Sequence, residues 1–260
     1  MGSGVAVGGS AGDDRNLQTM HADLSKPFFL PGPVDAICHA AARAPGPGVS
    51  VGDMVRDNVV ATRNLIDYAK NAGARVFILF SSLSVYGEVR DPIVDESTPV
   101  CNPGPYGVTK RLGEVMLSED PSGMRSLAMR LPGVIGRGST RNWLSRSLAA
   151  AQAGKELAVF SPNSPFNNAV HIADLCSFIG RLLDKHWHGF DLVTLSAAGH
   201  MNVGAIAARL AEGAARGSRV VIEDPGRSSF RISNTRAREQ FGYVPMDMSE
   251  MLDKFIAENQ

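Results

Sequence analysis

The feature that most constrains this sequence is an alternation of short apolar runs, rich in β-branched residues, with longer segments of helical periodicity. Such alternation is typical of βαβ units around a parallel sheet, because strands buried on both faces are apolar throughout and helices cover them. We expect strands at residues 34–38, 76–80, 127–131 and 192–196. We expect helices at residues 54–73, 106–117, 143–153, 172–183 and 203–215. The predicted fold class is therefore α/β.

Length and charge limit the classes of function. A chain of 260 residues is long enough for one large domain, or for a cofactor domain with a smaller lobe. Its 26 basic and 26 acidic residues form no long run of one sign, which predicts no nucleic-acid and no membrane partner. No stretch reaches the roughly 20 apolar residues of a membrane span, and the first residues do not resemble a signal peptide. We expect a cytoplasmic protein with small-molecule ligands.

The three cysteines, Cys38, Cys101 and Cys176, are scattered and odd in number. Their spacing matches neither a disulfide framework nor a zinc site. We therefore expect no metal, a reducing compartment, and cysteines that fill the core.

The residues from Tyr106 to Lys110 form a Tyr-x-x-x-Lys pattern on a predicted helix. Side chains four residues apart share a helix face, so the Lys110 ammonium is expected beside the Tyr106 phenol. A free tyrosine has a pKa near 10, and a nearby cation favours the phenolate, which makes the pair suitable for proton transfer. On a surface helix the same spacing arises by chance, so the surrounding sequence has to show whether the pair is catalytic.

A run of hydroxyl side chains, Ser81, Ser82 and Ser84, follows the predicted strand at residues 76–80. The carboxyl edge of an open α/β sheet is where ligands bind. We predict that Ser82 is the third catalytic group, holding the oxygen whose proton Tyr106 transfers. The alternative is a serine that caps the next turn.

These segments resemble the extended short-chain dehydrogenases/reductases, and within them the NAD-dependent epimerase/dehydratase family of nucleotide-sugar enzymes. The resemblance covers roughly residues 20–245 and implies a cofactor, NAD or NADP, and a nucleotide-diphosphate sugar as substrate. It implies cofactor contacts at Asp23, Leu24, His39, Ala40, Ala41, Asn58, Ser81, Tyr106, Lys110, Pro132 and Val134. It implies substrate contacts at Ser82, Ser84, Asn168, Arg141 and Arg227. His39 and His171 also suit buried structural roles, and Arg227 suits a solvated loop.

The amino terminus departs from the family, which opens with a strand, a Gly-x-x-Gly-x-x-Gly turn and a helix. Residues 5–12 suit a shortened first strand with a glycine turn, or residues 4–7 suit the second strand itself. We therefore predict a Rossmann-like doubly wound parallel sheet lacking most of its first βαβ unit, with a smaller interlaced substrate-binding lobe. The predicted division is a cofactor-domain remnant at residues 1–140 and a mainly substrate-binding lobe at residues 141–260, interlaced with the sheet near residues 168–196.

The resemblance implies that the chain is an epimerase or a 4-ketoreductase, with Tyr106 as the general acid/base. Dehydration is disfavoured because Ser82-Leu83-Ser84 stands where the resembling 4,6-dehydratases carry Thr-Asp-Glu. The alternative is a catalytically impaired remnant or a cofactor-sensing scaffold of the same fold. A homodimer through the helices at residues 54–73 and 106–117 is a further expectation from the family.

Overall fold

The computed structural model describes residues 3–7, 18–223 and 229–260. Two compact units share the chain. The first is made of Met1–Val85, Pro103–Ala128 and Trp187–Asp191, and the second of Tyr86–Asn102, Met129–His186 and Leu192–Gln260. Each unit thus combines segments that are distant in sequence. The functional division at residue 140 stays a prediction.

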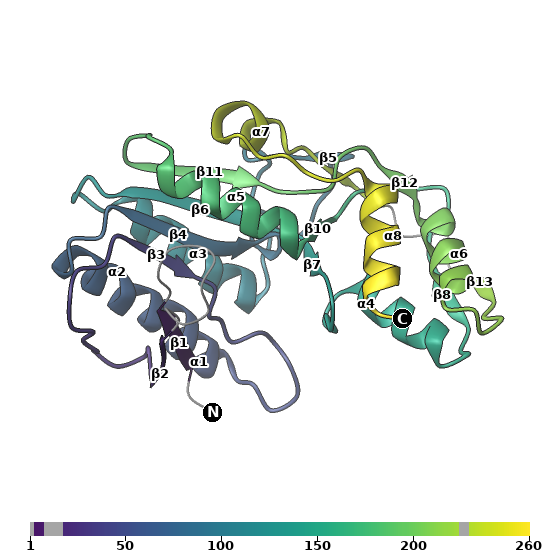
Figure 1. The fold of residues 1–260 in the computed structure, drawn as a ribbon, viewed down its shortest axis with the longest axis horizontal. Coiled ribbons are helices and arrows are strands. Elements are labelled where there is room, and N and C mark those ends of the chain that lie inside the picture. Colours follow the sequence, from purple (N-terminus) through teal and green to yellow (C-terminus); the bar gives the residue numbers. More distant parts are fainter. Residues whose placement is uncertain (1–2, 8–17, 224–228) are drawn as a thin grey trace. The chain divides into compact units, whose positions relative to one another are not determined.

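The predicted central strands are present. They are β3 (Ala36–His39), β4 (Val76–Ser82), β6 (Arg125–Leu131) and β11 (Phe190–Thr194), in the sheet order β11-β6-β4-β3 (Figure 1). β3 and β4 pair in parallel, with Ala36 opposite Val76. β4 is apolar on both faces, as expected of a strand covered on both sides. The predicted α/β class with a parallel central sheet is confirmed.

The helices of the first unit lie where the periodicity placed them. A capping box at Ser50 starts a continuous helical segment, α1 (Val51–Met54), η2 (Val55–Val60) and α2 (Ala61–Asn71), which stops before Gly73 at φ +74°. α3 (Pro105–Ser118) packs against β4 and α2 (Figure 1). The π-helical geometry of η2 was not expected.

The amino-terminal strand differs from the prediction. β1 (Ser3–Val7) pairs antiparallel with β2 (Gln18–Ala22) in a sheet of its own, so among the described residues its assignment to the parallel sheet is wrong. Ten residues separate the two strands, which is too few for the crossover that parallel pairing needs. Gly8, Gly9 and Gly12, the predicted glycine turn, lie outside the described residues. Residues 23–35 contain no helix.

The second unit is built from short strand pairs and helices. β7 (Gly133–Ile135) pairs in parallel with β10 (Ala169–His171). Three further pairs are β5 (Ile93–Val94) with β14 (Arg231–Ile232), β8 (Leu157–Val159) with β13 (Val220–Ile222), and β9 (Pro165–Phe166) with β12 (Met201–Asn202). The helices are α4 (Trp143–Gln152), α5 (Ile172–Asp184), α6 (Val203–Gly213), α7 (Thr235–Phe241) and α8 (Met248–Glu258). The first three helices confirm predictions, whereas α7 and α8 were missed.

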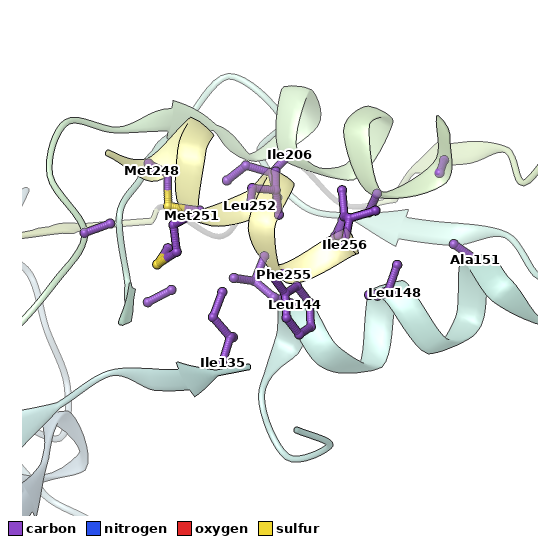
Figure 2. Close-up of a cluster of buried hydrophobic side chains, with 14 of the residues drawn as sticks. Ile135, Leu144, Leu148, Ala151, Ile206, Met248, Met251, Leu252, Phe255 and Ile256 are labelled. Atoms are coloured by element: carbon purple, nitrogen blue, oxygen red, sulfur yellow. The ribbon is translucent and has the colours of Figure 1, made fainter. Parts of the chain in front are cut away.

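The core of the second unit surrounds α8. Figure 2 shows Leu252, Phe255 and Ile256 of this helix among side chains from α4 and α6. Phe255 is 1% exposed. Complete burial of such a side chain contributes about 1.5–3 kcal/mol through the hydrophobic effect. This cluster is thus a main source of stability for the second unit.

The cysteines do not fill the core. Cys38 and Cys176 are exposed and Cys101 is partly exposed, so that prediction is wrong. Cys38 lies on β3, the last strand in the sheet order, and Cys176 lies at an exposed position of α5. Within the described ranges, no helix combines the length and apolar composition needed to cross a bilayer.

Candidate active site

The Tyr-x-x-x-Lys pattern lies in the first two turns of α3. Gly104 precedes the helix in an extended conformation, and Pro105 occupies its first turn, where a proline costs no backbone hydrogen bond. Tyr106 and Lys110 are therefore one helical turn apart on the same face. Tyr106 is half-buried, and Lys110 is only 4% exposed.

A glycine between them sets how closely this helix approaches the end of β4. A Cβ atom at Gly107 would lie 2.0 Å from the carbonyl oxygen of Ser84. Only glycine allows that approach without a backbone shift, because real Cβ contacts are never so short. Gly107 thus brings the Tyr106 turn directly against the Ser82–Ser84 turn. The sequence pattern does not predict this role for Gly107, although the residue stands beside the tyrosine.

Ser82 ends β4 and shapes the turn that follows. Its Oγ accepts a hydrogen bond from the Ser84 backbone N–H at 3.1 Å and donates one to the Ser84 Oγ at 3.2 Å. The turn-capping alternative for Ser82 is therefore present in the structure. Because the side chain is only partly buried, it also remains accessible to a ligand.

Lys110 is a buried cation. Burial lowers its pKa from 10.5 to about 8, although the carboxylate of Glu114 opposes part of that change. Within the described residues, no hydrogen bond or ion pair to its Nζ is found. An ammonium with three donors in this position suits the hydroxyl groups of a bound ligand.

Asn58 connects the π-helical segment to the loop after β3. Its amide accepts a hydrogen bond from the Arg43 N–H at 2.6 Å and donates to the Arg43 carbonyl at 3.1 Å. It also donates to Thr109 Oγ1 of α3 at 3.0 Å. Asn58 thus fixes the loop beside α3, and Thr109 is a supporting residue that the sequence pattern did not predict.

His39 is a buried residue at the end of β3. Its Nε2 lies 2.9 Å from Thr62 Oγ1, and burial together with the nearby Lys110 lowers its pKa to about 3. The ring is therefore neutral over the physiological range. This environment matches the structural alternative for His39, and its predicted cofactor contact stays a prediction, as do those of the exposed Ala40 and partly exposed Ala41.

Asp23 and Leu24 follow β2. Asp23 is exposed, and hydrogen bonds from the Ser25 hydroxyl and N–H lower the pKa of its carboxyl group. Leu24 is buried, and its carbonyl accepts a hydrogen bond from Asn64 of α2. Their contact with a cofactor stays a prediction.

The remaining predicted contacts belong to the second unit. Pro132 and Val134 are partly exposed, and Asn142 donates to the Val134 carbonyl. Arg141 is exposed. Asn168 has a buried Oδ1 that finds no partner among the described residues, which suits an acceptor for a ligand. Arg227 lies outside the described residues, so its predicted role stays a prediction.

His171 caps a helix. Its Nδ1 accepts a hydrogen bond from the Ala173 N–H at the start of α5, and its Nε2 lies 3.1 Å from the Glu258 carboxylate of α8. With both nitrogens engaged and 1% of the residue exposed, His171 has the buried structural role that its sequence context suits.

Comparison with known proteins agrees with this fold. The family described as "NAD dependent epimerase/dehydratase family" matches residues 12–204, which is more than half of the chain. The chain therefore belongs to the NAD-dependent epimerase/dehydratase family, whose name states a nicotinamide dinucleotide as its cofactor.

Individual proteins are also similar to this chain in sequence or in structure. The D-erythronate dehydrogenase of Cupriavidus necator is 30% identical over 161 residues, which cover 59% of this chain and 50% of that protein. Among the solved structures with this fold is RMD from Pseudomonas aeruginosa complexed with NADPH, with a TM-score of 0.76 and 21% identity over 90% of this chain and 86% of that chain. Another is the UDP-N-acetylglucosamine 4-epimerase from Methanobrevibacter ruminantium M1 in complex with UDP-N-acetylmuramic acid, with a TM-score of 0.74 and 19% identity over 91% of this chain and 79% of that chain. The chain spans about half the length of the curated relatives it matches.

The described residues fit such a cofactor at the β4–α3 edge. The buried Lys110 ammonium carries hydrogen-bond donors with no partner in the described part of the chain. Ribose hydroxyls are acceptors that would use them. The segment expected to receive the pyrophosphate lies outside the described residues.

Proposed function

We propose that this chain carries the proton-transfer site of an NAD(P)-dependent nucleotide-sugar epimerase or 4-ketoreductase. The observation that supports it is the docking of the Tyr106 turn against the Ser82–Ser84 turn through Gly107, with a buried ammonium one turn further along α3. A phenol, a hydroxyl and a cation at one sheet edge suit the oxidation of an alcohol or the reduction of a ketone.

Each residue has a distinct task in this reaction. Tyr106 removes the proton from a sugar hydroxyl or returns it to the ketone. Ser82 donates a hydrogen bond to the same oxygen, which holds it near the phenol. A bound nicotinamide would supply the hydride acceptor for the alcohol and the hydride donor for the ketone.

Lys110 supplies the charge that favours the phenolate of Tyr106. With a pKa of about 8, it is mostly protonated near neutral pH. Its low exposure reduces screening by water, so its charge acts more strongly on the phenol than a surface lysine would. Loss of its proton above pH 8 is expected to reduce the rate.

The proposed substrate class is a nucleotide-diphosphate sugar. Asn168, Arg141, Arg227 and Ser84 are the proposed contacts with a nucleotide-diphosphate sugar, since arginine binds phosphate through two parallel hydrogen bonds. The structural likeness to a UDP-sugar epimerase favours this class. The sequence likeness to D-erythronate dehydrogenase favours a sugar acid as the comparison substrate.

Cofactor binding and turnover test the proposal in sequence. Titration of the chain with NADH and NADPH, followed by fluorescence, is expected to show binding below millimolar concentration. A panel of UDP-sugars and D-erythronate then identifies the substrate by hydride transfer. Binding of neither cofactor below millimolar would favour the alternative of a catalytically impaired remnant or cofactor-sensing scaffold.

Substitution of the phenol tests the mechanism. Tyr106→Phe is expected to lower kcat by about 10²–10⁴-fold with little change in sugar-nucleotide affinity. Unchanged turnover in this variant would rule out the proposed role of Tyr106.

The homodimer predicted from the family stays a proposal. Val60, Val108, Leu112 and Val115 are apolar and exposed on the helices concerned. Light scattering coupled to gel filtration would measure the mass, and substitution of Leu112 by Glu is expected to shift a dimer to the monomer.

A further inference from the structure

A buried carboxylate lies one helical turn beyond Lys110. Glu114 is 0% exposed, although carboxylates are almost never fully buried unless they are paired. Its Oε1 accepts a hydrogen bond from the Ser81 hydroxyl at 2.5 Å, and its Oε2 lies 2.8 Å from Arg111 Nη1. Both oxygens therefore have partners, and one of those partners lies on a different element.

The bond to Ser81 joins the two elements that carry the proposed catalytic groups. Ser81 directly precedes Ser82 on β4, and neighbouring strand residues point to opposite faces of the sheet. Glu114 lies on α3, one turn after Lys110 and two turns after Tyr106. The carboxylate thus connects the helix of the acid/base pair to the strand end of the hydroxyl.

Burial of this carboxylate has a desolvation cost that its hydrogen-bond and ion-pair partners have to offset. Taking a charge out of water costs several kcal/mol, and an ion pair with a half-exposed arginine recovers part of it. An apolar residue would pack the same position without that cost. The presence of a carboxylate at this buried position therefore indicates a role other than packing.

The structure assigns Glu114 the role of a positioning residue, which holds the end of β4 against α3 through Ser81 and places a carboxylate one helical turn from Lys110. This inference rests on the proposed function for its catalytic meaning. Its geometric content, a link between α3 and β4, is independent of turnover.

The charged and titratable groups near Lys110 allow a clear test. On its own helix these are Tyr106, Arg111 and Glu114, and from β3 the neutral His39. On η2, Asp57 is held by Arg43 and Arg56. Glu114 is the group that raises the pKa of Lys110, so removal of its charge is expected to lower that pKa.

The experiment measures the Lys110 side chain directly. Lysine labelled at ¹³Cε is titrated by NMR in the full chain, with Lys110→Arg used to assign the signal. Glu114→Gln, which keeps an acceptor for Ser81, is expected to lower the Lys110 pKa by about half a unit or more. Glu119→Gln, an exposed carboxylate just after α3, serves as the matched control and is expected to cause no shift.

A second variant tests the mechanical link. Ser81→Ala removes the bond to Glu114 but keeps the carboxylate charge. It is expected to leave the Lys110 pKa unchanged while it speeds hydrogen exchange at the Ser82 and Ser84 amides about tenfold. An unshifted Lys110 pKa in Glu114→Gln, or unchanged exchange in Ser81→Ala, overturns the inference even if one of the variants does not fold.

Turnover separates this inference from the proposed function. If the chain is active, Glu114→Gln is expected to lower kcat about tenfold to a hundredfold with an unchanged KM, because misplacement of catalytic groups affects the rate more than binding. An inactive wild-type chain with the predicted NMR and exchange changes contradicts the proposed function but supports the link. An active wild type without those changes contradicts the link alone.

Discussion

The interior beside α3 and the interior around α8 are built from different side chains. Beside α3, the buried groups include Lys110, Glu114 and Thr109, none more than 4% exposed. Around α8, the buried groups are apolar, with Leu252 and Phe255 at 0% and 1% exposed (Figure 2).

The difference separates the residues that stabilise the protein from those that we propose to act in the reaction. Apolar burial stabilises at about 25 cal/mol per Å². Buried charges lose hydration and often recover no more than they lose. Substitutions around α8 are therefore expected to affect stability, whereas those beside α3 are expected to affect turnover more than stability.

The largest loss of stability is expected at Phe255. Phe255→Ala removes the ring from the centre of the α8 core and leaves a cavity, which costs about 3–5 kcal/mol. Denaturation in urea, followed by circular dichroism, measures the free energy of unfolding. A loss below about 1 kcal/mol would show that this core does not carry the stability of the second unit.

A smaller loss is expected at Gly107. Gly107→Ala places a methyl group against the Ser84 carbonyl, and the required backbone shift costs about 1–3 kcal/mol. The same shift is expected to reduce turnover strongly, because it moves Tyr106 away from Ser82. The control is Gly180→Ala on α5, where a Cβ meets nothing within 4 Å. Equal effects of the two substitutions would contradict the close approach at Gly107.

The start of α4 gives a reference for an ordinary helix cap. Asn142 accepts a hydrogen bond from the Ser145 N–H, so Asn142→Ala is expected to cost about 0.5–2 kcal/mol. Gly104 at the start of α3 offers no side-chain cap. Asn142→Asp retains the acceptor and is expected to restore most of the stability; failure to do so would mean that the bond to Val134, not the cap, matters.

The smallest effect on stability at neutral pH is expected for Lys110→Met. The substitution removes a buried charge while it keeps the aliphatic volume, so stability is expected to stay within about 1 kcal/mol or to rise. Turnover is expected to fall at least tenfold. A loss of several kcal/mol would show that the Lys110 ammonium stabilises the folded chain.

The same variant tests the pH dependence. The Lys110 pKa is about 8 in the folded chain and 10.5 in its ordinary state, so between these values the unfolded chain binds more protons. This group therefore makes the free energy of unfolding rise with pH from about 8 to 10.5. In Lys110→Met that rise is expected to disappear, as measured by denaturation at several pH values.

The sequence predicted the larger elements because periodicity and breakers act locally. The strand at β4 was placed from its apolar pattern, and the helix at α3 from the proline-rich loop of Pro99, Pro103 and Pro105 that precedes it. α7 was missed because its seven residues span too few turns to show a clear period. α8 was missed although Met251, Leu252, Phe255 and Ile256 recur at helical spacing. The hairpin of β1 and β2 was missed because the family resemblance favoured a parallel strand over the short connection.

The candidate site was predictable only in part. Tyr106, Lys110 and Ser82 were found because their spacing has a chemical reason. Gly107 and Glu114 were not, because their importance lies in contacts with Ser84 and Ser81 on another element. Local spacing does not reveal such contacts between residues that are distant in the chain.

The sharing of the chain between the two units has a consequence for synthesis and truncation. The first unit needs Trp187–Asp191 in addition to its earlier segments, and the second needs Tyr86–Asn102 from the first half. During translation neither unit is complete until most of the polypeptide has left the ribosome. For the same reason no single cut separates the chain into two fragments that each contain one whole unit. Limited proteolysis within residues 86–186 is therefore expected to unfold both units.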